Sequence, residues 1–180
     1  MQINSKIHFI GISGIGMSGI AELMLDKGYS IQGSDISVND NTKRLKKKGI
    51  KFFLGHNKKN IKYAHAVVYS SAIKNNNPEI REAYIKKIPV LSRADMLSEL
   101  MKNKKSIAIA GSHGKTTTTS LVGNIFNEAG LDPTIVNGGI INSFSNNNRY
   151  GKGEWMIVEA DESDGSFLKL PHQILSLIHI

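Results

Sequence analysis

The sequence contains no cysteine, four prolines and one tryptophan among its 180 residues. Without cysteine, neither a disulfide framework nor a thiolate-bound metal is possible. No apolar run reaches the ~18 residues that a membrane-spanning helix requires. Residues 1–6 lead straight into an apolar stretch and do not have the pattern of a signal peptide. We therefore expect a cytoplasmic protein with no segment inserted in a membrane.

Positive charge exceeds negative charge, with a formal net charge of +8 and a pI near 9.6. The lysines are scattered along the chain, and aromatic residues make up 7% of it. A nucleic-acid-binding protein would concentrate its cations on one face and carry a recognition motif. We therefore expect no nucleic-acid partner. We interpret the charge as a solvated surface, with attraction of anionic small ligands as the alternative.

In the first half of the chain, short apolar runs alternate with helical patterns, which predicts a parallel sheet covered by helices. The expected strands are residues 6–12, 29–33, 51–54, 64–70 and 89–91. The expected helices are residues 20–28, 41–48 and 78–87. A further helix is expected over 93–101, and a charged break follows it at 102–105. We therefore predict a Rossmann-like domain over 1–92 and a connecting segment over 93–104.

The remaining residues, 105–180, predict the start of a second α/β domain. Its expected strands are residues 106–110, 134–136, 154–160 and 174–180, its expected helix is 115–130, and a polar loop is expected over 142–153. Apolar residues at helical spacing mark the helix, namely Leu121, Val122, Ile125, Phe126 and Ala129. With so few strands, a domain of about 75 residues does not complete an α/β layer. We therefore expect the chain to be a fragment.

A glycine loop follows the first expected strand, with Gly14, Gly16 and Gly19 spaced as G-x-G-x-x-G. Asp35 lies about twenty residues further on, where a dinucleotide site would hold a ribose. Taken alone, this pattern indicates NAD. A UDP sugar offers the same diphosphate and nucleoside groups, so both ligands remain open. Ser70 and Ser71 end another strand and are expected on the same ligand-binding edge.

A second glycine loop joins the strand 106–110 to the helix that begins near Lys115. Its pattern is Gly111-x-x-Gly114-Lys115-Thr116, shorter than the general P-loop because Ile109 stands where the first glycine would be. The first amides of the helix point into such a loop, Lys115 can reach terminal phosphates, and Thr116 has the hydroxyl that binds Mg²⁺. The pattern predicts a nucleoside triphosphate site. The alternative is a glycine- and threonine-rich turn.

An acidic run, from Glu159 to Asp164, follows the strand 154–160 and contains four carboxylates. Carboxylates so close would repel one another unless a cation lies among them. Oxygen ligands beside a phosphate suit Mg²⁺. A P-loop upstream strengthens this interpretation, since such sites pair the threonine with a carboxylate from a neighbouring strand end. The alternative is a solvated acidic turn.

With these residues in place, the sequence resembles the Mur ligases over nearly its whole length. Several stretches carry the resemblance, and the loop with Met17-Ser18-Gly19 is similar to that of the alanine-adding member: His8 to Gly11, Gly14 to Ala21, Gly33 to Asp35, Ser70 to Ile73, Ser92 to Ala94, Met96-Leu97, Gly111 to Thr118 and Glu159 to Asp164. The shortened P-loop is the form that this family uses. Ser13 departs from the family, which usually has glycine there.

The resemblance implies an ATP-dependent ligase of peptidoglycan synthesis that joins L-alanine to the lactyl carboxylate of UDP-N-acetylmuramate through an acyl phosphate. Lys115 and Glu159 would be catalytic, and Thr116 and Glu159 would hold Mg²⁺. The implied ATP-binding residues are Gly111, Ser112, His113, Gly114, Lys115, Thr116 and Thr117. The implied UDP-sugar-binding residues are Gly14, Gly16, Gly19, Ser34, Asp35, Ser70, Ser71 and Asn137. Asp161, Glu162 and Asp164 are weaker candidates for contacts to metal-bound water, to the substrate or to the loop.

The family normally has a third domain and an Asn-x-Asp-x-x-His segment, and residues 177–180 do not reproduce that segment. We therefore expect the 180 residues alone to be inactive. Three other functions stay open. The first glycine loop alone suits an NAD-binding protein, the second suits a P-loop ATPase, and both suit a non-catalytic nucleotide-binding module.

Overall fold

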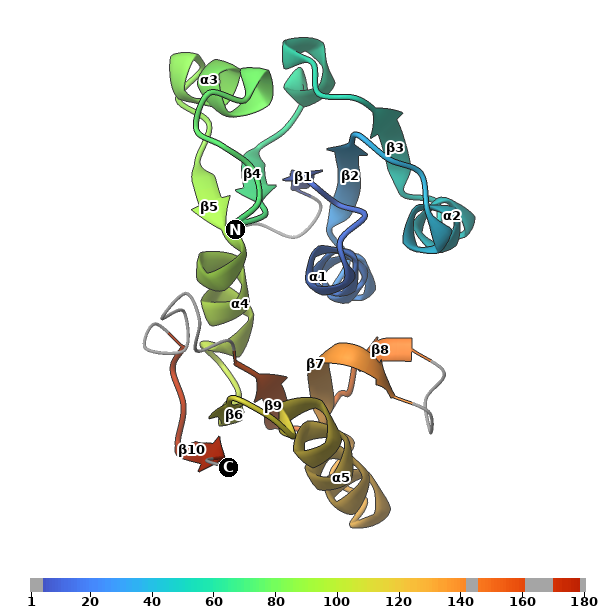
Figure 1. The fold of residues 1–180 in the computed structure, drawn as a ribbon, viewed down its shortest axis with the longest axis vertical. Helices are drawn as coiled ribbons and strands as arrows, with labels where there is room; N and C mark the ends of the chain where they lie inside the picture. The colour runs from blue at the N-terminus through green and yellow to red at the C-terminus, as the bar shows by residue number, and fades with distance from the viewer. Residues whose placement is uncertain (1–4, 142–145, 161–169, 179–180) are drawn as a thin grey trace. The chain divides into compact units, whose positions relative to one another are not determined.

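The structure is a computed structural model that describes residues 5–141, 146–160 and 170–178. The chain divides into two compact units, Met1–Arg93 and Ala94–Ile180 (Figure 1). The division falls at the start of the segment 93–104, which we expected to connect two domains. In each unit the strands form one five-stranded sheet that is wholly or mainly parallel, so the predicted α/β class is confirmed.

Unit 1 has its strands in the order β3-β2-β1-β4-β5, and all neighbouring strands are parallel. Its elements are β1 (Lys6–Ile10), α1 (Ile15–Asp26), β2 (Ser30–Asp35), α2 (Asp40–Lys47), β3 (Lys51–Leu54), the 3₁₀ helix η1 (Lys58–Ile61), β4 (Ala66–Tyr69), α3 (Pro78–Ile85) and β5 (Val90–Ser92). Figure 1 shows α1 and α2 on one face of the sheet and η1 and α3 on the other. The helix η1 was not predicted.

Apolar side chains fill both faces of this sheet, which is why β1 is buried along nearly its whole length. On the α3 face, Ile10 and Val67 pack with Ile80 and Ala83. The helix α2 starts with a capping box, in which the Asn39 side chain accepts a hydrogen bond from the Thr42 amide. Local signals and burial therefore agree for these elements.

Unit 2 has its strands in the order β10-β6-β9-β7-β8, with β8 antiparallel to β7. Its elements are α4 (Arg93–Met101), which begins at the last residue of unit 1, β6 (Lys105–Gly111), α5 (Lys115–Glu128), β7 (Thr134–Ile141), β8 (Asn146–Arg149), β9 (Trp155–Glu159) and β10 (Ile174–Ile178). Two expectations were wrong here. The predicted loop 142–153 contains β8, and the described part of the unit has five strands where four were expected. The strand β7 is also longer than the predicted 134–136.

The helix α5 packs against β6, β7 and β9. Its Val122 and Phe126 contact the core, and Phe126 meets the Trp155 ring edge-on with 5.1 Å between ring centroids. The apolar pattern predicted a wider buried face than the structure has, because Leu121 is 57% exposed and Ile125 is 65% exposed. Among the described residues, no helix is long and apolar enough to cross a bilayer.

Candidate functional site

The first glycine loop joins β1 to α1 at the point where the order of the strands changes direction. The neighbours of β1 are β2 on one side and β4 on the other, and ligands of such sheets bind in the crevice outside the carboxyl ends at this point. Gly14 is the N-cap of α1, and no side chain caps the helix. The first amides of α1 are thus available to a ligand. Gly19 is buried within α1, so its position indicates packing.

Asp35 holds this loop to the end of β2. Its Oδ2 accepts a hydrogen bond from the Ser13 amide at 2.9 Å, and its Oδ1 accepts from the Ile36 amide at 2.8 Å. The loop is also tied to β2 through the Gly11 amide, which donates to the Ser34 carbonyl at 2.9 Å. The carboxylate keeps acceptor capacity for one further donor, such as a ribose hydroxyl.

The three serines predicted near the ligand differ in their surroundings. Ser70 lies at the glycine loop, because a Cβ placed on Gly11 would be 3.1 Å from the Ser70 Cβ. Ser71 is exposed. Ser34 is fully buried, and its hydroxyl donates to Glu79 at 2.6 Å. In this structure Ser34 is therefore part of the buried interior beside the carboxyl ends of the strands, while Ser70 and Ser71 lie at that edge of the sheet.

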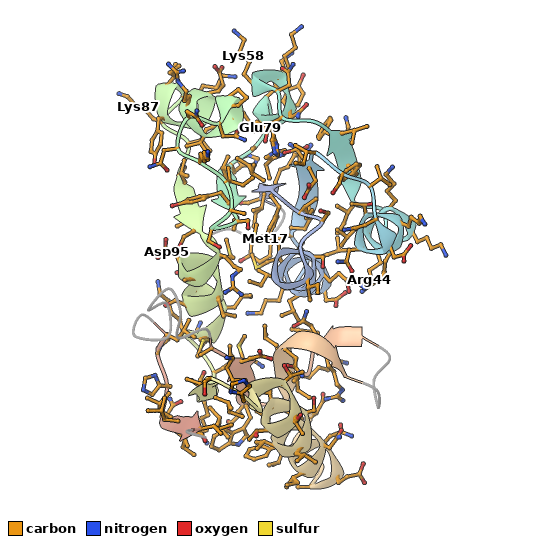
Figure 2. All side chains as sticks on the ribbon, viewed as in Figure 1. Met17, Arg44, Lys58, Glu79, Lys87 and Asp95 are labelled. Carbon is orange, nitrogen blue, oxygen red and sulfur yellow. The ribbon has the colours of Figure 1, made fainter. Side chains whose placement is uncertain are left out.

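Sequence reasoning missed a buried polar network around Glu79, which is labelled in Figure 2. Glu79 also accepts hydrogen bonds from the Asn60 side chain at 2.6 Å and the Asn57 amide at 3.2 Å. The Nε2 of fully buried His8 lies 3.3 Å from its Oε2, and His56 Nδ1 lies 3.4 Å away. The sequence predicted only a helix over 78–87 here, and Asn77 caps that helix, α3.

Two opposing effects act on the pKa of Glu79. Burial is the larger single influence and raises the pKa. The neighbouring His8, together with the hydrogen bonds from Ser34 and Asn60, lowers it more in sum, so the pKa lies below its ordinary value. Glu79 is therefore ionised at neutral pH. Its carboxylate links Ser34 at the end of β2 to the Asn57 amide in the segment after β3.

The second glycine loop joins β6 to α5 in unit 2. Gly111 has a φ of +143° and lies against β10, where a Cβ would collide with the Ile178 carbonyl. Gly114 has a φ of +75° and is the N-cap of α5. The Lys115 ammonium donates a hydrogen bond to the Gly111 carbonyl, so it lies over the loop. Residues with side chains rarely adopt these positive φ angles, which explains why glycine occupies both positions.

Thr116 and Glu159 meet at the ends of neighbouring elements. Thr116 lies in the first turn of α5, Glu159 ends β9, and β9 pairs with β6. The Thr116 hydroxyl donates to Glu159 Oε2 at 3.0 Å. Adjacent ligands of an octahedral ion with bonds of about 2.1 Å lie about 3 Å apart. This pair of hard oxygens therefore fits Mg²⁺, which takes few protein ligands and completes its shell with phosphate and water.

Asn137 links β7 to the same first turn of α5. Its Nδ2 donates to the Thr116 carbonyl at 3.2 Å and to the Ser120 hydroxyl at 2.8 Å, and the side chain is 2% exposed. It therefore braces the first turn of α5 in this structure, and the contact with the UDP sugar that the family resemblance implies for Asn137 stays a prediction. Ser112, His113 and Thr117 are exposed at the loop. Asp161, Glu162 and Asp164 lie outside the described residues.

Comparison with known proteins adds the family. Residues 6–105 match the Mur ligase family, catalytic domain. The chain is 56% identical over 175 residues to the UDP-N-acetylmuramate–L-alanine ligase of Azorhizobium caulinodans, covering 97% of this chain and 38% of that protein. It is 58% identical over 175 residues to the ligase of the same name from Parvibaculum lavamentivorans, covering 97% of this chain and 36% of that protein. The chain thus spans less than half the length of these relatives.

Solved structures agree in fold. The UDP-N-acetylmuramate-alanine ligase of Thermotoga maritima superposes with a TM-score of 0.89 at 34% identity, covering 96% of this chain and 40% of that one. A UDP-N-acetylmuramate:L-alanyl-gamma-D-glutamyl-meso-diaminopimelate ligase from Neisseria meningitides superposes at 0.88 with 24% identity, covering 97% of this chain and 61% of that one, and this shows the fold alone. Because the family match extends over more than half of its residues, the chain belongs to the Mur ligase family.

Proposed function

We propose that this chain is the substrate-binding segment of a ligase that joins L-alanine to UDP-N-acetylmuramate at the expense of ATP, in cytoplasmic peptidoglycan synthesis. The observation that carries the proposal is the arrangement in unit 2, where Lys115 lies over a glycine loop and Thr116 meets Glu159. The identity to proteins named for this reaction supports the choice of substrates. Unit 1 would bind the UDP sugar and unit 2 would bind ATP.

The chemistry explains why a triphosphate is required. A carboxylate oxygen is a poor leaving group, so amide formation first needs an activated acyl group. In the proposed first step the lactyl carboxylate oxygen attacks the γ-phosphorus, an O–P bond forms, and the bond to ADP breaks. The amine of L-alanine then attacks the acyl carbon, a C–N bond forms, and phosphate leaves from the tetrahedral intermediate. The nitrogen finally loses its proton to solvent or a base.

The residues of unit 2 would act mainly by stabilising charge. Two anions must approach each other in the first step, and the Lys115 ammonium would neutralise charge on the transferred phosphate. Bound Mg²⁺ would polarise the phosphate oxygens. Thr116 and Glu159 would hold that ion, and Asn137 would keep Thr116 in place through the first turn of α5. The free amides of the glycine loop would bind the phosphate chain.

The direct test is a chimera in which this chain replaces the matched segment of the Azorhizobium caulinodans ligase. We expect ADP release that depends on both UDP-N-acetylmuramate and L-alanine. Lys115→Ala should lower the turnover by a hundredfold or more, equivalent to about 3 kcal/mol. Lys105→Ala is the matched control, because Lys105 begins β6, the strand that leads into the glycine loop, and forms an exposed ion pair with Glu154. Near-normal turnover of Lys115→Ala would contradict the assignment.

A further inference from the structure

Arg93 lies against the first glycine loop. A Cβ placed on Gly16 would be 3.0 Å from Arg93 Nη1 and 3.5 Å from its Cδ. The same construction at Gly14 meets nothing closer than the Gly11 carbonyl oxygen, at 3.6 Å. The absence of a side chain at Gly16 therefore makes room for a guanidinium. The two glycines have different tasks, since Gly14 leaves open space and Gly16 admits Arg93.

The sheet order explains how a residue so far along the chain reaches this loop. Arg93 directly follows β5, and β5 pairs with β4, which in turn pairs with β1. All three strands are parallel, so their carboxyl ends lie at the same edge. The loop after β1 and the residue after β5 therefore meet at the edge that also carries Ser70.

The charge of Arg93 has no partner among residues 5–141, 146–160 and 170–178, since the guanidinium makes no hydrogen bond or ion pair with them. It is half-buried, and it lies beside the positive end of α1, whose first turn contains no acidic residue. A cation at this end of a helix is unfavourable by itself. An anion that accepts hydrogen bonds from Arg93 and from the α1 amides together would remove this cost.

We propose that Arg93 binds the diphosphate of the nucleotide ligand of unit 1 and makes affinity depend on that diphosphate. A guanidinium suits this task because its planar set of donors matches phosphate oxygens in pairs. The inference rests on the proposed function, in which unit 1 binds a UDP sugar. It adds a side chain that discriminates a nucleoside diphosphate from the bare nucleoside.

The test compares UDP with uridine on the 180-residue chain by NMR titration, which measures dissociation constants into the millimolar range. Arg93→Gln should weaken UDP binding at least about tenfold, as expected for loss of a charged hydrogen-bond donor. Its affinity for uridine should stay within about twofold, because uridine has no phosphate to contact. The matched control is Arg81→Gln, an exposed arginine on α3, which should change neither constant.

An unchanged ratio of UDP to uridine affinity in Arg93→Gln would overturn the inference while leaving the proposed function intact. Failure of the wild-type chain to bind UDP would overturn both. Thermal melts of each variant show whether it folds. If Arg93→Gln does not fold, Arg93→Lys gives the second measurement, since lysine keeps the charge and loses the paired donors. That variant should still lose part of the UDP affinity, and wild-type affinity would refute the role.

Discussion

Replacing Glu79 with glutamine should destabilise unit 1 without affecting unit 2. The carboxylate accepts hydrogen bonds from Ser34, Asn60 and the Asn57 amide, at 2.6, 2.6 and 3.2 Å. A glutamine keeps one acceptor oxygen and turns the other into a donor, which then faces donors. Hydrogen bonds to charged groups contribute about 1.5–3 kcal/mol each, and removing the charge also relieves its burial cost. We therefore expect a net loss of about 2–3 kcal/mol.

The assay must separate the two units, and the chain provides a way to do so. Trp155 is the one tryptophan and lies in β9 of unit 2, so its fluorescence follows unit 2 alone during urea unfolding. Amide hydrogen exchange of β1 and β2 follows unit 1. The matched control is Glu82→Gln, on the same helix, since Glu82 forms a surface pair with Lys86 and should cost less than about 1 kcal/mol.

The pH dependence gives an independent check on the same residue. The pKa of Glu79 is lower in the folded chain than in the unfolded chain. Its contribution to the free energy of unfolding is therefore present above the unfolded value of about 4.3, and it is lost as the pH falls through the folded value. The gap between wild type and Glu79→Gln should be widest near neutral pH and close in acid. A cost no larger than that of Glu82→Gln would refute this reasoning.

Two further predictions concern Gly33 in β2 and the pair formed by Thr116 and Glu159. Gly33→Ala should destabilise unit 1 by about 1–3 kcal/mol in urea unfolding, because its Cβ would lie 2.7 Å from the Phe9 carbonyl oxygen, whereas Gly14→Ala has space and should cost less than about 1 kcal/mol. Thr116→Val should weaken binding of Mg-ATP at least about tenfold in calorimetry while leaving metal-free ATP nearly unchanged, and Glu159→Gln should do the same. Equal losses with and without Mg²⁺ would contradict their role as ligands of the ion.

The order of elements in unit 1 could be predicted because apolar strands and helical patterns alternate regularly there. The prediction missed β8 because its residues, Asn146–Arg149, are polar. An edge strand needs one neighbour and gains its pairing from backbone hydrogen bonds, so its side chains leave no apolar pattern. The exposure of Leu121 and Ile125 was also unforeseen, since helical spacing shows that a stripe exists and not how much of it a small sheet covers.

The candidate site was predictable where chemistry follows local sequence. Thr116 meets Glu159 because β6, which leads into α5, is the neighbour of β9 in the sheet. The start of the helix and the end of β9 therefore lie close together. The contacts of Glu79 and Arg93 were not predictable, because each depends on which distant strands become neighbours. Ser34 illustrates the same limit, since a hydroxyl at a strand end can face the ligand or the interior, and here it is buried against Glu79.

The central claim is that unit 1 binds a UDP sugar. The most direct measurement is the thermal unfolding of the 180-residue chain with UDP-N-acetylmuramate or with NAD, each added separately. A ligand that binds only the folded state stabilises it by about 2.7 kcal/mol at a hundredfold excess over its dissociation constant. The account predicts an increase in melting temperature with UDP-N-acetylmuramate and none with NAD. An increase with NAD alone would contradict it and would favour a dinucleotide-binding protein.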